Sequence, residues 1–201
     1  MHLISHRGFW KKKVEQNSLI SIKRSFQNKM GIEVDVRLYN NKIYVSHDHS
    51  KPKLLFDKIL KMAPKKLFIA INIKEDGLGD ILKQSIKKYK INNYFCFDMS
   101  FPEMIKYKKK NLNIAERMSD YEKKIFFNSK NIWIDQFKKD WCKLSKIKML
   151  LKLNKRLFIV SNELHSKKYI NQWSIIKKIS KNNNIYLCTD KIIKAKAFFN
   201  L

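Results

Sequence analysis

Glycine and proline are scarce in this sequence. Its 201 residues include only 4 glycines and 3 prolines, which leaves little material for long flexible linkers. A chain of this length forms one hydrophobic core most readily, because a domain commonly contains about 100–200 residues. The sequence therefore predicts a single compact domain over residues 1–201.

Long apolar runs and cysteine pairs are lacking as well. No stretch approaches the roughly 18 uncharged apolar residues of a membrane-spanning helix, and no cleavable hydrophobic leader precedes His6 and Arg7. Cys96, Cys142 and Cys188 are widely separated and form no CxxC pair, which disfavours a zinc site or a redox couple. We expect a cytoplasmic protein with three buried thiols and no transmembrane segment.

Acidic residues are few beside the basic ones. The 44 lysines and arginines outnumber the 17 aspartates and glutamates, and the formal net charge is +27. Such a charge can favour nucleic-acid binding. Lysine is spread along the whole chain, however, and no RNP motif, helix-turn-helix signature or zinc-finger spacing is present. We therefore expect no nucleic-acid partner and interpret the charge as favouring an anionic substrate.

Short apolar or β-branched runs alternate with stretches of helical periodicity along the chain. Eight main strands are predicted, at 3–8, 31–38, 67–74, 94–99, 113–118, 131–137, 156–162 and 184–189, with a short return strand at 42–47. The predicted helices are 17–30, 54–62, 79–89, 102–109, 141–153, 169–180 and 192–199. This alternation predicts an α/β fold, a compact (β/α)8 TIM barrel with lean helices and loops; a doubly wound open sheet is the alternative.

Two carboxylates share one face of the second predicted strand. In Ile32-Glu33-Val34-Asp35-Val36 the period of two places Glu33 and Asp35 on one side and three aliphatic residues on the other. If the aliphatic residues pack against helices, both carboxylates face the barrel interior. They would repel each other there unless a cation neutralises them, which points to Mg²⁺ or Ca²⁺. An edge strand with solvated carboxylates is the other interpretation.

Polar residues also lie at the ends of nearly all the remaining predicted strands: His6, Arg7, Asn72, Lys74, Asp98, Glu116, Asp135, Glu163 and Asp190. In a TIM barrel these ends meet at the face that carries the chemistry.

Counting outwards from the Asn40-Asn41 turn places residue 46 opposite Asp35 and residue 48 opposite Glu33, which brings His47 beside the carboxylates. Trp10 follows the first strand and is a candidate substrate contact.

Four motifs in this order resemble one known family. His6-Arg7-Gly8, Gln16-Asn17-Ser18, the run 31–36 and Val45-Ser46-His47-Asp48 are similar to the motifs of glycerophosphodiester phosphodiesterases, within the phospholipase C-like phosphodiesterase superfamily. The chain also resembles a shorter subgroup associated with bacterial capsule or surface-polysaccharide loci. The resemblance implies a TIM barrel that hydrolyses a small phosphodiester with the help of a divalent metal ion.

The resemblance also implies roles for individual residues. His6 and His47 would be the general acid/base pair, Glu33 and Asp35 would bind the metal, and Arg7 would contact the phosphate. Such a pair of imidazoles can deprotonate the attacking hydroxyl and protonate the departing alkoxide. The attacking group would be water or a neighbouring substrate hydroxyl, and the residues do not decide between them.

Two positions depart from the family pattern. Gln16 replaces a usual glutamate, although Glu15 is adjacent, and Asn72 replaces the usual third-strand glutamate ligand. Asn72 would be a weak metal ligand, because its amide oxygen carries no charge. Lys74 is then a second candidate phosphate contact. Glu163, a candidate substrate contact, or Asp98 could compensate for the missing carboxylate.

The sequence thus predicts a phosphodiesterase acting on a glycerophosphodiester-like or glycan-linked phosphodiester, in lipid, glycerol or capsule metabolism. Its first alternative is a catalytically impaired barrel that binds a phosphorylated ligand, suggested by Asn72 and Gln16. A metal-independent phosphodiesterase also stays open. A basic nucleic-acid-binding protein is the weakest of these hypotheses.

Overall fold

The computed structural model describes residues 1–49 and 54–201. Its residues form two compact units, one of Ser5–Ile114 and one of Met1–Ile4 with Ala115–Leu201. The boundary between them falls inside the first strand, β1 (His2–His6). That residues 1–201 make a single domain stays a prediction.

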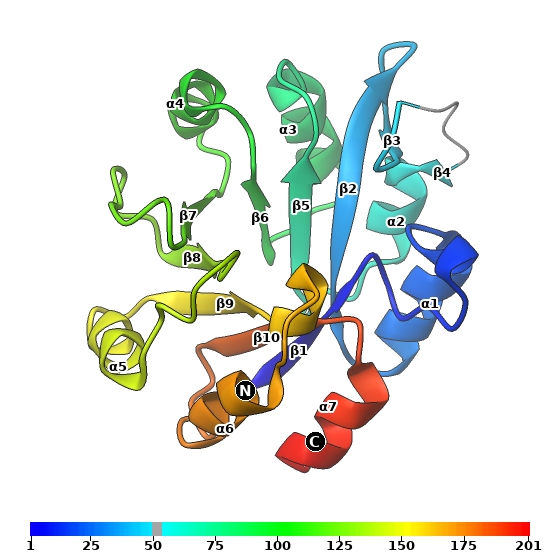
Figure 1. Ribbon diagram of the computed structural model, residues 1–201. Helices are drawn as coiled ribbons and strands as arrows, with labels where there is room; N and C mark the ends of the chain where they lie inside the picture. Colours follow the sequence, from blue (N-terminus) through cyan, green and yellow to red (C-terminus); the bar gives the residue numbers. More distant parts are fainter. Residues whose placement is uncertain (50–53) are drawn as a thin grey trace. The chain divides into compact units, whose positions relative to one another are not determined.

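The unit Ser5–Ile114 contains a mixed sheet whose strands follow the order β4-β3-β2-β5-β6. Three of them run parallel, as Figure 1 shows: β2 (Gly31–Tyr39), β5 (Ile69–Ile73) and β6 (Tyr94–Phe97). Two short antiparallel strands extend the sheet beyond β2: β3 (Lys42–Val45) and β4 (Leu54–Leu55). The helices of this unit are η1 (Lys13–Glu15), α1 (Leu19–Gln27), α2 (Phe56–Met62), α3 (Gly79–Lys88) and α4 (Phe101–Lys109).

The other unit contains the strand order β1-β10-β9-β8-β7. Its strands after β1 pair in parallel: β7 (Ala115–Met118), β8 (Asn131–Ile134), β9 (Arg156–Val160) and β10 (Ile185–Thr189). Its helices are α5 (Leu144–Lys152), η2 (Asn162–His165), α6 (Ile170–Lys177) and α7 (Ile192–Phe199). All eight predicted main strands and all seven predicted helices are therefore found, with ends that differ by a few residues.

Local differences from the predicted elements have local causes. The predicted helix at 54–62 begins only at Phe56, because Leu54 and Leu55 pair with β3. The first helix starts at Leu19 since the Ser18 hydroxyl caps it and accepts a hydrogen bond from the Ser21 amide at 3.3 Å. A short apolar pair such as Leu54-Leu55 fits either strand or helix, which is why periodicity alone misplaced it.

Burial in the parallel strands follows their composition. Ile32, Val34 and Val36 on β2 are fully buried, and all of β5 is buried as well. Such strands are covered on both faces, as parallel strands usually are. Glu33 and Asp35 are each only 1% exposed, and β2 lies between β3 and β5. The interpretation as an edge strand with solvated carboxylates is therefore wrong.

The three cysteines are buried, as predicted, and they form no disulfide with one another. Burial raises the pKa of the Cys96 thiol, and it raises that of Cys142 to about 12. Thiols with such pKa values are poor nucleophiles near neutral pH, so we assign them no chemistry. In the part of the chain that the structure describes, no helix is both long and apolar enough to cross a membrane.

Candidate active site

The buried carboxylates of β2 lie between two partner strands. On the β5 side, Asp35 is opposite Asn72 in the parallel register, and Glu33 is opposite Ala70. On the β3 side, the Ser46 amide donates a hydrogen bond to the carbonyl oxygen of Asp35 at 3.0 Å. This bond confirms that residue 46 lies opposite Asp35, so the predicted hairpin register is correct at that point.

Asp35 holds two cationic side chains. The Nε atom of Arg7 lies 2.9 Å from its Oδ2 atom, and the Nζ atom of Lys74 lies 3.1 Å from its Oδ1 atom. Asn17 donates a third contact, from Nδ2 to Oδ2 at 2.8 Å. Burial by itself would raise the pKa of Asp35, but Lys74, Arg7 and the Asn17 hydrogen bond together lower it. Asp35 is therefore a fixed anion that positions two cations.

The loop after β1 brings Arg7 to Asp35. Arg7 has a left-handed backbone with φ of 55°, and its amide donates to the Oε2 atom of Glu33 at 3.2 Å. Gly8 follows with φ of 84°, and a Cβ atom there would lie 2.5 Å from the Ser21 hydroxyl oxygen. Only glycine fits this approach of the loop to α1 without strain. The fixed loop in turn fixes the guanidinium group over β2.

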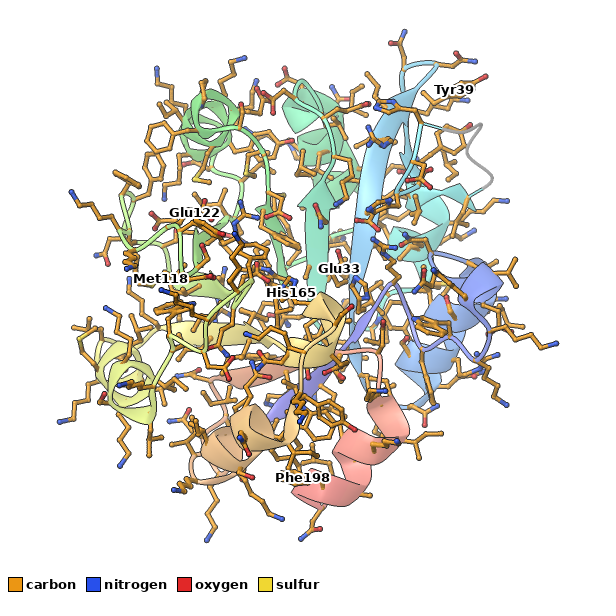
Figure 2. The ribbon with its side chains drawn as sticks, in the orientation of Figure 1. Glu33, Tyr39, Met118, Glu122, His165 and Phe198 are labelled. Atoms are coloured by element: carbon orange, nitrogen blue, oxygen red, sulfur yellow. The ribbon has the colours of Figure 1, made fainter. Side chains whose placement is uncertain are left out.

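Glu33, labelled in Figure 2, is the second buried carboxylate of β2. The Nε2 atom of His6 is 4.0 Å from the Oε2 atom of Glu33, and the His6 side chain is 21% exposed. Burial raises the pKa of Glu33 to about 7, and the charge of Asp35 adds to the rise, while His6, Arg7 and Lys74 oppose it. Glu33 therefore exchanges a proton in the range where an imidazole does.

This raised pKa predicts that the protein becomes less stable as the pH rises through neutrality. The Glu33 carboxyl binds its proton more tightly when folded, with a pKa of about 7 against an ordinary value of 4.5. The stabilisation is complete below 4.5 and is lost through about pH 7, by up to about 3 kcal/mol. Urea unfolding between roughly pH 4 and 8 measures the slope. The neutral variant Glu33→Gln should flatten it, and an unchanged slope in that variant would contradict the assignment.

His47 lies just beyond β3, and its side chain is 46% exposed. Its Nδ1 atom is 2.6 Å from the Oδ1 atom of Asp48, and its carbonyl oxygen accepts a hydrogen bond from Arg37 Nε at 3.1 Å. Arg37 also pairs with Glu75 at 3.3 Å. The backbone at His47 is thus held from β2. The backbone bond from the neighbouring Ser46 to Asp35 brings this part of the chain to β2, and the catalytic role of the His47 ring stays a prediction.

Sequence reasoning assigned no role to Asn17 or Arg37. Asn17 binds Asp35 through its side-chain nitrogen, and its side-chain oxygen accepts a hydrogen bond from the Asp35 amide at 3.4 Å.

Arg37 follows Glu33 and Asp35 at the same spacing of two residues, a signal that places all three on one face of β2. Glu15, in contrast, pairs with Arg24 at 2.9 Å, so it does not replace the missing carboxylate at Gln16.

Two predicted substrate contacts remain: Trp10, which is close to His6 in the sequence, and Glu163, which belongs to the other unit. Trp10 is half-buried in the loop after β1. In the other unit, Glu163 accepts hydrogen bonds from the hydroxyls of Ser161 and Thr189, and so links the ends of β9 and β10. His165, at the end of η2 in Figure 2, has its Nε2 atom 2.9 Å from the carboxylate of Asp135. The substrate contacts assigned to Trp10 and Glu163 stay predictions.

The ligands that a divalent metal ion would need are only partly present. Asn72 is 8% exposed, and its Oδ1 atom lacks a hydrogen-bond partner within residues 1–49 and 54–201. It offers an oxygen but no charge, while both Asp35 oxygens already face Arg7 and Lys74. Across those same described residues, His, Cys, Asp and Glu side chains form no group of three or more that could hold a metal.

Electrostatics also opposes a divalent ion in this arrangement. A doubly charged ion about 4 Å from the Lys74 ammonium would be repelled by about 8 kcal/mol at an effective dielectric constant of about 20, which cancels the attraction of one carboxylate at the same distance. With its pKa of about 7, Glu33 carries only part of a negative charge near neutral pH, so Arg7 and Lys74 already offset the charge of Glu33 and Asp35. The donor set therefore does not fit a divalent ion, and the predicted Mg²⁺ or Ca²⁺ is left to experiment.

Comparison with solved structures identifies the fold. A glycerophosphodiester phosphodiesterase from Agrobacterium tumefaciens superimposes with a TM-score of 0.69 at 12% identity, over 100% of both chains. A phosphodiesterase from Oleispira antarctica, in complex with the product sn-glycerol-3-phosphate, gives 0.62 at 12% identity over 100% of this chain and 97% of its own. A glycerophosphoryl diester phosphodiesterase from Parabacteroides distasonis gives 0.52 at 13% identity over 99% and 86%.

No protein-family model matches the sequence, and no curated protein does either. The structural likeness confirms the predicted fold class, because this α/β chain matches the (β/α)8 phosphodiesterases along its whole length. At 12–13% identity the likeness shows the fold alone. The chemistry has to be argued from the residues of the site.

Proposed function

We propose that the protein is a phosphoric diester hydrolase that cleaves a glycerophosphodiester-like or glycan-linked phosphodiester. The observation that carries this proposal is the buried Asp35, which holds Arg7 and Lys74 side by side within 3.1 Å, in the strand that also carries Glu33 next to His6. Two fixed cations beside an imidazole suit a phosphodiester anion. The fold shared with phosphodiesterases supports the same reaction class.

In the proposed reaction His6 and His47 move the protons. One imidazole takes the proton of the attacking oxygen, which belongs to water or to a neighbouring substrate hydroxyl. That oxygen forms a bond to phosphorus while the ester bond to the leaving alcohol breaks. The second imidazole gives its proton to the departing alkoxide. Glu33, 4.0 Å from His6 Nε2, is placed to stabilise the imidazolium form of that ring.

Arg7 and Lys74 hold the phosphoryl group in this proposal. An arginine has five N–H donors and a lysine has three, so each can keep its contact with Asp35 and still donate to a non-bridging oxygen. Such donors stabilise the negative charge that grows on those oxygens in the transition state. Asp35 is a positioning residue, since it fixes both cations before the substrate arrives.

A second candidate is a barrel that binds a phosphorylated ligand without turning it over. Gln16 and Asn72 favour it, because both are neutral amides where the resembled family usually has carboxylates. The same pair of cations would then hold the ligand. One example of such a ligand is sn-glycerol-3-phosphate, the product in the complex of the Oleispira antarctica phosphodiesterase.

An assay that compares phosphate diesters with a monoester tests the proposal. We expect hydrolysis of bis(p-nitrophenyl) phosphate, glycerophosphocholine or glycerophosphoethanolamine, and little of p-nitrophenyl phosphate, because the monoester lacks the second ester group and its dianionic phosphoryl group repels an attacking oxygen. Calorimetric titration with sn-glycerol-3-phosphate separates the candidates. Binding without turnover of any diester would favour the binding barrel over the hydrolase.

A further inference from the structure

We propose that Lys74, together with Arg7, supplies the positive charge that a divalent metal ion would otherwise supply at the β2 carboxylates, so that this chain hydrolyses its phosphodiester without a metal ion. The claim of hydrolysis without a metal ion rests on the proposed function. The claim about the charge of the site can be measured whether or not a substrate is known.

The first argument is the balance of charge. Glu33 and Asp35 contribute two acidic groups, and Arg7 and Lys74 contribute two basic ones. Asp35 is 1% exposed, and each of its oxygens has a cationic nitrogen within 3.1 Å. A divalent ion could reach this carboxylate only by displacing the ammonium group, and it would leave the site with an excess of positive charge.

The second argument is the chemistry of the neighbouring strand. Asn72 and Lys74 are two residues apart at the end of β5, so they share the face that meets Asp35. The Lys74 amide is itself bonded to the Val36 carbonyl oxygen of β2 at 3.1 Å, which fixes the base of the side chain. The position opposite Asp35 thus offers a neutral amide, and the next residue on that face offers a cation. Neither adds the negative charge that Mg²⁺ or Ca²⁺ requires.

The third argument is the unpartnered amide oxygen of Asn72. It is buried and accepts no hydrogen bond from any residue in the described part of the chain. An amide oxygen in this state suits a neutral donor such as a substrate hydroxyl, whereas a buried carboxylate in the same place would need a second cation. Replacing Asn72 by glutamate should therefore change which cation the site accepts.

The test measures metal binding and hydrolysis on the same proteins. Wild type, Lys74→Met, Asn72→Glu and the double variant are treated with EDTA, and Mn²⁺ binding is followed by electron paramagnetic resonance. We expect no Mn²⁺ binding by wild type and clear binding by the double variant, which has three carboxylates and no ammonium. Lys83→Met, an exposed lysine on α3, is the matched control and should behave as wild type.

Hydrolysis of bis(p-nitrophenyl) phosphate gives the second readout. Wild type should keep its rate within about twofold in EDTA, and Lys74→Met should lose about 10²- to 10³-fold. The double variant should recover part of that loss only when Mn²⁺ or Mg²⁺ is added. Loss of wild-type activity in EDTA with recovery on adding Mg²⁺ or Ca²⁺ would overturn the inference, and so would Mn²⁺ binding by wild type. If no protein hydrolyses any diester, the proposed function fails, and Mn²⁺ binding alone then decides the charge argument.

Discussion

Replacing His6 or His47 by alanine is expected to lower the rate of phosphodiester hydrolysis by about 10²- to 10⁴-fold for each change. Each imidazole moves one of the two protons in the proposed reaction, and His6 lies 4.0 Å from Glu33. Steady-state hydrolysis of bis(p-nitrophenyl) phosphate measures both losses.

The double variant makes this prediction sharper. Residues that act as one unit are not additive, so His6→Ala with His47→Ala should lose little more than the worse single variant. His2→Ala is the matched control, because His2 is an exposed histidine on the same strand as His6. An unaffected rate in either single variant would remove that histidine from the reaction. If His2→Ala lost as much activity as the His6 and His47 variants, the losses would reflect a destabilised fold instead of a catalytic role.

Much of this site could be predicted from the sequence because strand periodicity decides which side chains share a face. The alternation in 32–36 placed Glu33 and Asp35 together and inward, and the Asn40-Asn41 turn set the register that brings residue 46 to Asp35. Both turn residues have positive φ, at 48° and 57°, as a tight hairpin turn requires. Such local rules need no knowledge of the rest of the chain.

The pairing of Arg7 with Asp35 could not be predicted in the same way. Arg7 follows a strand, and its direction depends on a left-handed residue and on the close approach of Gly8 to α1. Likewise, β2 and β5 are joined by a long crossover, so the register that sets Asp35 opposite Asn72 is not fixed by any turn. These contacts depend on tertiary packing, and they show Asp35 as the counterion of Arg7 and Lys74, while its role as a metal ligand stays a prediction.

Replacing Asp35 by alanine is expected to lower the free energy of unfolding by about 3 kcal/mol, and the melting temperature by roughly 6–12 °C. The carboxylate is 1% exposed and contacts Arg7, Lys74 and Asn17, so its removal leaves two cations without their counterion. Both cations are about one-fifth exposed and can turn partly towards water. The expected loss of unfolding free energy therefore lies at the lower end of the range for breaking a buried ion pair. Thermal unfolding followed by circular dichroism measures it.

A surface ion pair provides the matched control for this loss. Asp80 is 74% exposed and pairs with Lys110, so Asp80→Ala removes the same charge and should cost at most about 1 kcal/mol. The milder variant Asp35→Asn has a second expected effect. It removes the repulsion that helps to raise the pKa of Glu33, so it should also weaken the fall of stability near pH 7. Equal costs for Asp35→Ala and Asp80→Ala, with an unchanged pH slope in Asp35→Asn, would show that Asp35 does not organise the cations, and the phosphate site built on it would then be wrong.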